Sequence, residues 1–170
     1  MNKTTKRISF AALLTALTVI FLYASALFPS GQLGFIAAAS LFTAAAVIET
    51  GIGGGVIVFL GSSILAELML PNKGLLLLYI LFFGYYPIVK SLIEKLNALF
   101  LELLLKTVVF NIALSVVWFV LPNIIFGVSI PDINAILLYA AGNIVFAVFD
   151  FGLSKLIWFY IERVSRSVRK

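Results

Sequence analysis

Six ionisable side chains lie inside or close to the long apolar stretches of the sequence. They are Glu49, Glu67, Glu102, Lys106, Asp150 and Lys155. A charge in an apolar environment is costly unless it is paired or hydrated, so each of these residues needs a partner or has a function. The chain contains no cysteine and no histidine, which excludes disulfides, thiolate chemistry and imidazole ligands. Because it also lacks a set of nucleophile, base and oxyanion donors, we expect no enzyme, no catalytic residue, no metal site and no cofactor.

Lys106 and Asp150 are the candidates for an ion pair between two helices. At about 1.5 Å per residue, they lie roughly 16 Å and roughly 20 Å along their segments from the basic residues at one surface. Because the two segments run in opposite directions from that surface, the side chains reach a similar depth, and we predict a structural ion pair. Two alternatives stay open: local pairs of Lys106 with Glu102 and of Asp150 with Lys155, or a proton or ion relay.

A second set of polar and aromatic residues lies toward the outer half of the predicted spans, where an apolar wall with a few placed polar groups would suit a small molecule. The predicted substrate-binding residues are Gln32, Glu67, Asn72, Asn111, Ser115, Trp118, Tyr139 and Asn143. In the last segment, one side of the helix is polar or small and comprises Tyr139, Asn143, Ala147, Asp150 and Ser154. The alternative is that Asn and Ser bond a neighbouring helix and that Trp and Tyr are ordinary interface residues.

The composition is that of a membrane protein. Of the 170 residues, 63% are hydrophobic and 11% are charged, whereas roughly a quarter of the residues of a soluble domain are charged. Apolar segments long enough to cross a bilayer are predicted at residues 8–28, 34–49, 52–70, 75–90, 98–121 and 134–161. We therefore predict an all-α fold, a single polytopic transmembrane domain over residues 1–170 built as a six-helix bundle. Segments two and three are marginal in length, so four or five crossings with a re-entrant segment are the alternative.

The basic residues set the predicted orientation. Pro87, followed by Lys90 and Lys95, predicts a helix that leaves the hydrocarbon. The next helix is expected to begin near Lys95, and the alternative is that residues 91–105 lie partly along the inner surface as an amphipathic connector. Lys and Arg also gather at both ends of the chain, whereas the outer loops hold only Lys73. Because cytoplasmic segments carry the excess of Lys and Arg, we predict a multi-pass protein of the cell membrane with both termini in the cytoplasm.

The first segment offers surfaces for another helix. Ala12 and Ala16 form a pair of small residues four positions apart. A second narrow side consists of Ala11, Thr15, Thr18, Leu22 and Ser25. Such surfaces let a second helix approach to backbone contact, and the partner is either a helix of this chain or a separate protein. A cleaved signal peptide is the alternative to a retained first span.

The six spans in under 200 residues, the basic start and the stretch Ser9–Leu17, alanine pair included, resemble the substrate-binding S components of energy-coupling factor transporters. In that family the alanine motif docks on a transmembrane coupling subunit, so the resemblance implies that Ala12 and Ala16 are the docking positions here. It also implies a vitamin, a precursor or a metal ion bound in the outer half. No signature for riboflavin, thiamine, biotin or folate is present, and the absence of histidine argues against the nickel or cobalt type.

From the residues and this resemblance we expect a membrane-embedded substrate-binding and translocation subunit for uptake of a small, vitamin-like solute. Its expected partners are the lipid bilayer, the solute, and a transmembrane coupling subunit with ATPase subunits. Basic residues at the ends of spans indicate orientation, so no nucleic-acid partner is expected. The alternative is a membrane scaffold or cell-shape protein similar to MreD, in which the polar residues only hold helices together.

Overall fold

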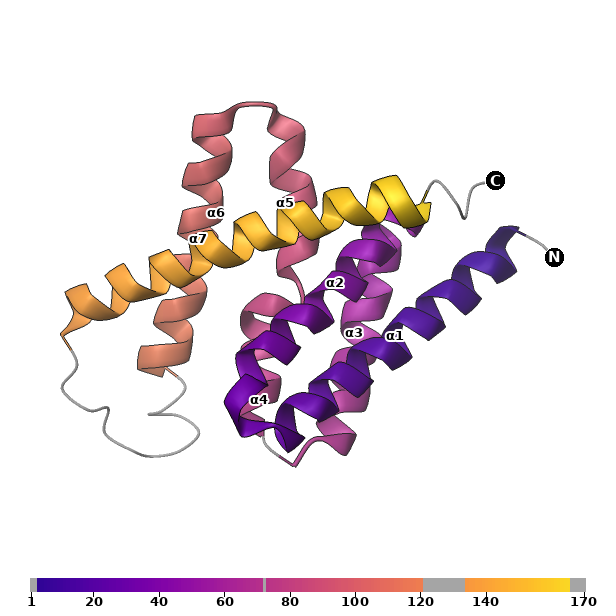
Figure 1. Ribbon diagram of the computed structural model, residues 1–170, viewed down its shortest axis with the longest axis horizontal. Coiled ribbons are helices and arrows are strands. Elements are labelled where there is room, and N and C mark those ends of the chain that lie inside the picture. Colours follow the sequence, from indigo (N-terminus) through magenta and orange to yellow (C-terminus); the bar gives the residue numbers. More distant parts are fainter. Residues whose placement is uncertain (1–2, 72, 121–133, 166–170) are drawn as a thin grey trace. The chain divides into compact units, whose positions relative to one another are not determined.

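The computed structural model of the chain describes residues 3–71, 73–120 and 134–165, and within these ranges the regular structure is helical (Figure 1). The α-helices are α1 (Lys3–Leu27), α2 (Gln32–Thr50), α3 (Ile52–Met69), α4 (Lys73–Leu78), α5 (Tyr86–Ile93), α6 (Leu99–Ser115) and α7 (Ala135–Tyr160). Shorter helical turns are η1 (Pro29–Gly31), η2 (Tyr79–Phe83), η3 (Glu94–Leu96), η4 (Val116–Val120) and η6 (Ile161–Ser165). The all-helical fold predicted from the sequence is confirmed for the described residues.

Among the described residues, six stretches are long and apolar enough to cross a membrane. They are Thr5–Leu27, Pro29–Thr50, Ile52–Met69, Lys73–Leu96, Leu99–Phe119 and Ala135–Arg163. The fourth stretch joins α4, η2, α5 and η3. Within it, η2 is a π-helical turn closed by a hydrogen bond of 2.7 Å from the Gly84 amide to the Tyr79 carbonyl. Segments two and three are both continuous helices of sufficient length, so each of the six predicted segments contains a helix that could span a membrane.

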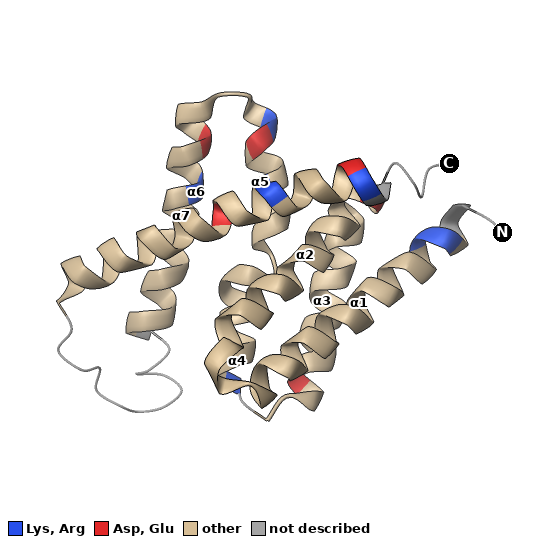
Figure 2. Ribbon diagram, viewed as in Figure 1, with Lys and Arg blue, Asp and Glu red and all other residues tan. Residues whose placement is uncertain are grey.

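The chain forms two compact units. The first comprises residues 1–91 with 153–170, and the second comprises residues 92–152. In the first unit α1, α2 and α3 pack on one another, and one core cluster contains Leu22, Ile36 and Tyr79, none of which has measurable exposure. Charged residues gather near the ends of α1, α2 and α3, and the middle of each of these helices carries none (Figure 2). A long uncharged middle is what a helix that spans hydrocarbon requires.

One side of α1 is buried inside the first unit. Its residues are Ala11, Thr15, Thr18, Leu22 and Ser25, the second narrow side recognised in the sequence. Thr15 and Thr18 donate hydrogen bonds to the Ala11 and Leu14 carbonyls four residues earlier, so their hydroxyls are satisfied by the helix itself. This side therefore packs against helices of the same chain. The Gly61 position of α3 comes close to it, because a Cβ there would lie 3.3 Å from the Thr15 methyl.

Gly51 makes the turn between α2 and α3. Its φ of 85° and ψ of −178° lie in a region that only glycine adopts readily. Gly51→Ala is expected to lower the free energy of unfolding by about 1–3 kcal/mol, the usual cost of holding a side chain in a disfavoured backbone region. No atom lies within 4 Å of the place that a Cβ would occupy, so the cost is conformational rather than steric. Denaturation by SDS titration in mixed micelles measures the change.

Gly53→Ala is the matched control for this turn. Gly53 lies inside α3, has no positive φ and also has open space around its Cβ position. Alanine is favoured over glycine inside a helix, so this variant should be as stable as the parent chain or slightly more so. Equal effects at positions 51 and 53 would contradict the conformational explanation.

The connection between α5 and α6 differs from the sequence-based prediction. Pro87 is the second residue of α5, where a missing amide hydrogen costs nothing, so the proline begins a helix and does not end one. Lys90 follows inside α5 and is only 1% exposed, although it was expected at an exit from the hydrocarbon. Asn97 has a left-handed φ of 51° and stops the chain after η3, so α6 begins at Leu99 and the prediction of a helix start near Lys95 is wrong.

Candidate functional site

Four of the predicted substrate-binding residues contact one another across α6 and α7. The Asn111 and Asn143 side-chain amides exchange two hydrogen bonds of 3.1 and 3.0 Å. Each amide nitrogen also donates to a backbone carbonyl of its own helix, Thr107 for Asn111 and Tyr139 for Asn143. Both donor hydrogens of each amide are therefore used within the protein.

Ser115 and Tyr139 form the next pair along the same two helices. Their hydroxyl oxygens lie 2.6 Å apart. Because Ser115 donates its proton to the Asn111 carbonyl, the Tyr139 hydroxyl is the donor in this pair. Together with the amide pair, this contact forms a ladder of polar side chains between α6 and α7, which we call the polar ladder (Asn111, Ser115, Tyr139 and Asn143).

The ladder fixes an antiparallel register, because the paired residue numbers rise along α6 and fall along α7. Phe110 and Phe146 stack in that register, with ring centroids 4.6 Å apart. Gly142 permits the approach, since a Cβ there would lie 2.8 Å from the Leu114 side chain. The packed side of α7 includes buried Phe146, whereas Ala147, which was grouped with that side from the sequence, is exposed. A step of four residues from Asn143 leads to Ala147, whereas the packed side of the helix continues three residues on, at Phe146.

The Asn111–Asn143 pair is expected to contribute to stability. Replacing Asn143 by leucine leaves the Asn111 side-chain oxygen without its donor, so the free energy of unfolding should fall by about 1–2 kcal/mol. The double variant with Asn111→Leu should cost less than the sum of the two single changes by about 1 kcal/mol, because neither amide is then left alone. Val145→Leu, on the exposed side of α7, is the control and should change nothing. Additive effects of the two asparagine changes would contradict a direct contribution from the pair.

Lys106 lies on α6 and is 7% exposed. Its ammonium nitrogen is 2.7 Å from Glu94 Oε1, in η3, and 3.7 Å from Asp150 Oδ2, in α7. The Lys106–Asp150 contact joins the two residues that helix depth paired in the sequence. The closer partner is Glu94, which none of the sequence-based alternatives included, and no ion pair between Lys106 and Glu102 occurs in the described part of the chain.

The remaining predicted substrate-binding residues do not join the polar ladder. Trp118 is half-buried in η4 of the second unit. Gln32 and Glu67 belong to the first unit, where Glu67 makes an exposed ion pair with Lys73, 2.9 Å long. Asn72 lies outside the residues that the structure describes. The eight residues are thus divided between two units, and four of them bond to one another.

The first unit contains buried polar groups that the sequence analysis did not select. The Tyr79 hydroxyl lies 2.8 Å from the Ser62 hydroxyl, and since Ser62 donates to the Val58 carbonyl, Tyr79 is the donor. Thr43 is also buried, and its side chain interacts with the Tyr79 hydroxyl. No spacing rule links these positions, because they come from three different helices.

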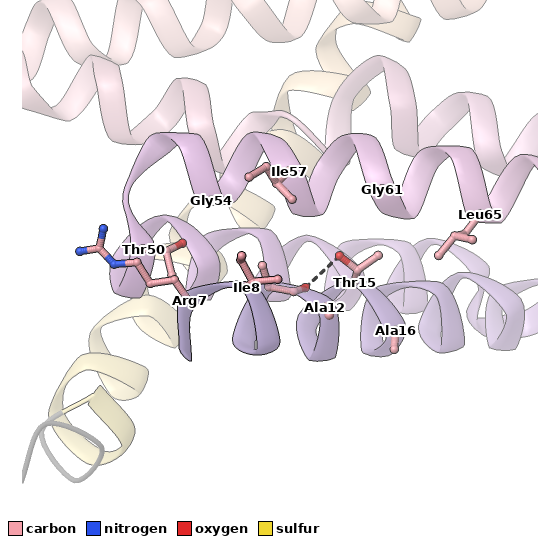
Figure 3. Close-up of a pocket in the computed structure, with 11 residues that line it drawn as sticks. Arg7, Ile8, Ala12, Thr15, Ala16, Thr50, Gly54, Ile57, Gly61 and Leu65 are labelled. Atoms are coloured by element: carbon pink, nitrogen blue, oxygen red, sulfur yellow. Dashed lines mark hydrogen bonds between the residues drawn. The ribbon is translucent and has the colours of Figure 1, made fainter. Parts of the chain in front are cut away.

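An apolar groove of about 470 Å³ runs between α1 and α3. Ala12 and Ala16 line it from α1, and Gly54 and Gly61 line it from α3 (Figure 3). It extends from Arg7 and Thr50 at one end to Leu65 at the other (Figure 3). Ala12 and Ala16 are exposed, unlike the narrow side of α1 that packs within the chain. The surface formed by Ala12, Ala16, Gly54 and Gly61 is called the small-residue groove below.

A second apolar groove, of about 430 Å³, lies on another side of α1. It is lined by α1, by α2 and by the last turns of α7, including Phe10, Leu17, Phe42 and Tyr160. We call it the leucine–aromatic groove. Neither groove has the convergent ionisable groups that acid–base chemistry requires, and among residues 3–71, 73–120 and 134–165 no metal-binding group of acidic, histidine or cysteine side chains occurs.

These grooves can accommodate apolar partners: a small-residue surface suits a helix, and an apolar groove lined by large side chains suits an acyl chain. Comparison with the known protein families gave no match, and neither curated proteins nor solved structures gave a similar chain.

Proposed function

We propose that this chain is the membrane-embedded substrate-binding and translocation subunit of an uptake transporter for a small, vitamin-like solute. In this proposal it works with a separate ATP-driven coupling module, and a helix of the coupling subunit docks in the small-residue groove. The observation that carries the proposal is the exposure of Ala12 and Ala16 beside Gly54 and Gly61. The same two alanines are the docking positions implied by the resemblance to S components.

The physical case for docking is the chemistry of the groove. Lipid tails are as apolar as leucine, so helices associate in a membrane through close packing rather than through burial of apolar surface. Small residues on both walls let a third helix come near the backbones of α1 and α3. Gly54 and Gly61 add no side chain of their own, and Ala12 and Ala16 add one carbon each. A lipid chain could fill such a groove, but it would gain no hydrogen bond or shape-specific contact there.

The proposed orientation places both termini in the cytoplasm of a cell-membrane protein with six crossings. Lys6, Arg7, Lys95 and Arg163 would then lie on the inner side and Lys73 on the outer side, in agreement with the excess of basic residues in cytoplasmic segments. The solute would be taken up from the outer half.

Purification of tagged chain from its native membrane, with identification of the associated proteins, tests this function. Ala16→Phe should abolish recovery of a transmembrane coupling subunit and its ATPases, because the ring fills the groove. Ile20→Phe is the control, since Ile20 lies one turn further along α1 and is 59% exposed. Recovery of the same subunits with both variants would refute docking in the groove. Recovery of no ATPase with the parent chain would refute the proposed transport function.

A membrane scaffold or cell-shape protein is the second candidate. It is favoured by the polar ladder, because Asn111, Ser115, Tyr139 and Asn143 satisfy one another and leave no free donor for a solute. In this case the same purification should recover membrane proteins of cell-shape assembly without ATPases. Deletion of the gene for this chain should then change cell shape and leave solute uptake intact.

A further inference from the structure

A small polar cavity lies where α1 begins and α2 ends. Its volume is about 270 Å³, and its lining residues are Lys6, Arg7, Phe10, Glu49 and Thr50. It belongs to neither the polar ladder nor the proposed docking surface, although Arg7 and Thr50 also border the end of the small-residue groove. Two cations, one carboxylate and one aromatic ring are thus gathered at the ends of two spans.

The charges of this cavity form no ion pair within the described part of the protein. Lys6 and Arg7 are exposed and pair with no other described residue. The Tyr160 hydroxyl interacts with the Glu49 carboxylate, but the Glu49 Oε1 atom is buried and has no hydrogen-bond partner among the described residues. A buried carboxylate oxygen without a donor costs free energy, so a ligand with an N–H group would be favoured there. An anionic group would be favoured beside the two cations.

The cavity lies next to the leucine–aromatic groove. Phe10 lines both, and Ile48, next to Glu49 in the sequence, lines the groove. Tyr160, like Phe10, packs on the core cluster that includes buried Ala11 and Leu14. The groove is almost wholly apolar, so one ligand that occupies both spaces has a charged end and a hydrocarbon end. A phospholipid has this form.

We propose that the cavity and the leucine–aromatic groove bind one phospholipid with a phosphoethanolamine headgroup. The phosphate lies beside Lys6 and Arg7, the primary ammonium donates a hydrogen bond to Glu49 Oε1, and an acyl chain lies in the groove. The carboxylate is what selects this headgroup. A phosphoglycerol headgroup has no ammonium to neutralise Glu49, and a choline headgroup has a cation without an N–H donor.

Arg7 borders both sites, but the acyl chain lies on a different side of α1 from Ala12 and Ala16. The lipid site therefore does not depend on the proposed transport function. A lipid held there would fix the spacing of α1, α2 and the end of α7 at the membrane surface. Basic residues at the ends of spans commonly contact lipid headgroups. The carboxylate inside this cavity is the unusual component, because it would repel an anionic lipid that has no ammonium group.

Native mass spectrometry of the full chain in nanodiscs tests the proposal. The nanodiscs contain equal amounts of phosphatidylethanolamine, phosphatidylglycerol and phosphatidylcholine with the same acyl chains. Retention of phosphatidylethanolamine should exceed that of each other lipid by about tenfold, the effect of one charge-assisted hydrogen bond. Stepwise N-methylation of the ethanolamine lipid should reduce retention, most strongly at the final step, which removes the last N–H. Equal retention along this series would overturn the proposal without need of any variant.

Two substitutions assign the contacts. Glu49→Gln should abolish the preference for phosphatidylethanolamine, and Arg7→Gln should weaken retention of all three lipids. Glu67→Gln is the matched control, because Glu67 is also a carboxylate close to the end of a span but lies in an exposed pair with Lys73. An unchanged preference in Glu49→Gln, or an equal loss in Glu67→Gln, would overturn the site. Soluble phosphoethanolamine should not displace the lipid, and displacement would show that the groove plays no part.

Discussion

Replacing Lys106 by methionine is expected to lower the free energy of unfolding by about 2–3 kcal/mol. Breaking a fully buried ion pair typically costs more, about 3–5 kcal/mol. The substitution keeps the long apolar stem and removes only the ammonium. Glu94 and Asp150 then lose a cation at 2.7 and 3.7 Å. The Glu94 side chain is 42% exposed, so water recovers part of the cost. SDS titration in mixed micelles measures the change.

Double-mutant cycles separate the partners of Lys106. Coupling with Glu94→Gln should be the larger, because that contact is a direct hydrogen bond, and coupling with Asp150→Asn should be smaller but measurable. Glu102→Gln is the control, since Glu102 lies one turn before Lys106 on α6 without an ion pair to it. Coupling only to Glu102 would show that the interaction is local to α6. No coupling to any of the three would exclude a structural role for the lysine.

Leu22→Ala is the second substitution with a large expected effect, about 2–5 kcal/mol of the free energy of unfolding. Leu22 is fully buried in a cluster with Ile36, Leu76 and Tyr79. Truncation leaves a cavity that these neighbours fill only in part. Because lipid is as apolar as the core, the decrease in the free energy of unfolding comes from lost packing contacts rather than from transfer of the side chain between water and the core.

Leu13→Ala on the same helix is the control for this effect. The Leu13 side chain is 56% exposed, so in a bilayer it would contact lipid both before and after unfolding. The change should stay within about 0.5 kcal/mol, as for substitutions away from packed sites. If Leu13→Ala lowered the free energy of unfolding as much as Leu22→Ala, the side of α1 that packs in the core would not be the one described here.

Several features followed directly from the sequence. The six apolar segments were recognised by length and composition, since a helix in lipid must be long and uncharged through its middle. The two sides of α1 were also recognised, and the structure buries the Thr18 side and exposes Ala12 and Ala16. Counting helix rise from one surface placed Lys106 and Asp150 at similar depth, and the distance between them is 3.7 Å.

Other features depend on turns and on contacts between distant segments. Glu94 reaches Lys106 only because Asn97 adopts a left-handed conformation and reverses the chain before Leu99, and no sequence pattern indicated that reversal. Lys90 was expected at a membrane surface because a proline precedes it, yet Pro87 starts α5 and Lys90 lies inside. Spacing along one helix could select polar residues, but not show that those of α6 and α7 would bond to one another.

Cysteine labelling tests most directly the claim of six crossings with both termini in the cytoplasm. The chain has no cysteine of its own, so each introduced thiol is the sole site for a maleimide that does not cross membranes. Lys73→Cys should react in intact cells, whereas Lys6→Cys, Lys95→Cys and Arg163→Cys should react only after permeabilisation. Reaction of positions 6 and 163 from opposite sides of the membrane would contradict the orientation, and with it the docking and uptake proposed for this chain.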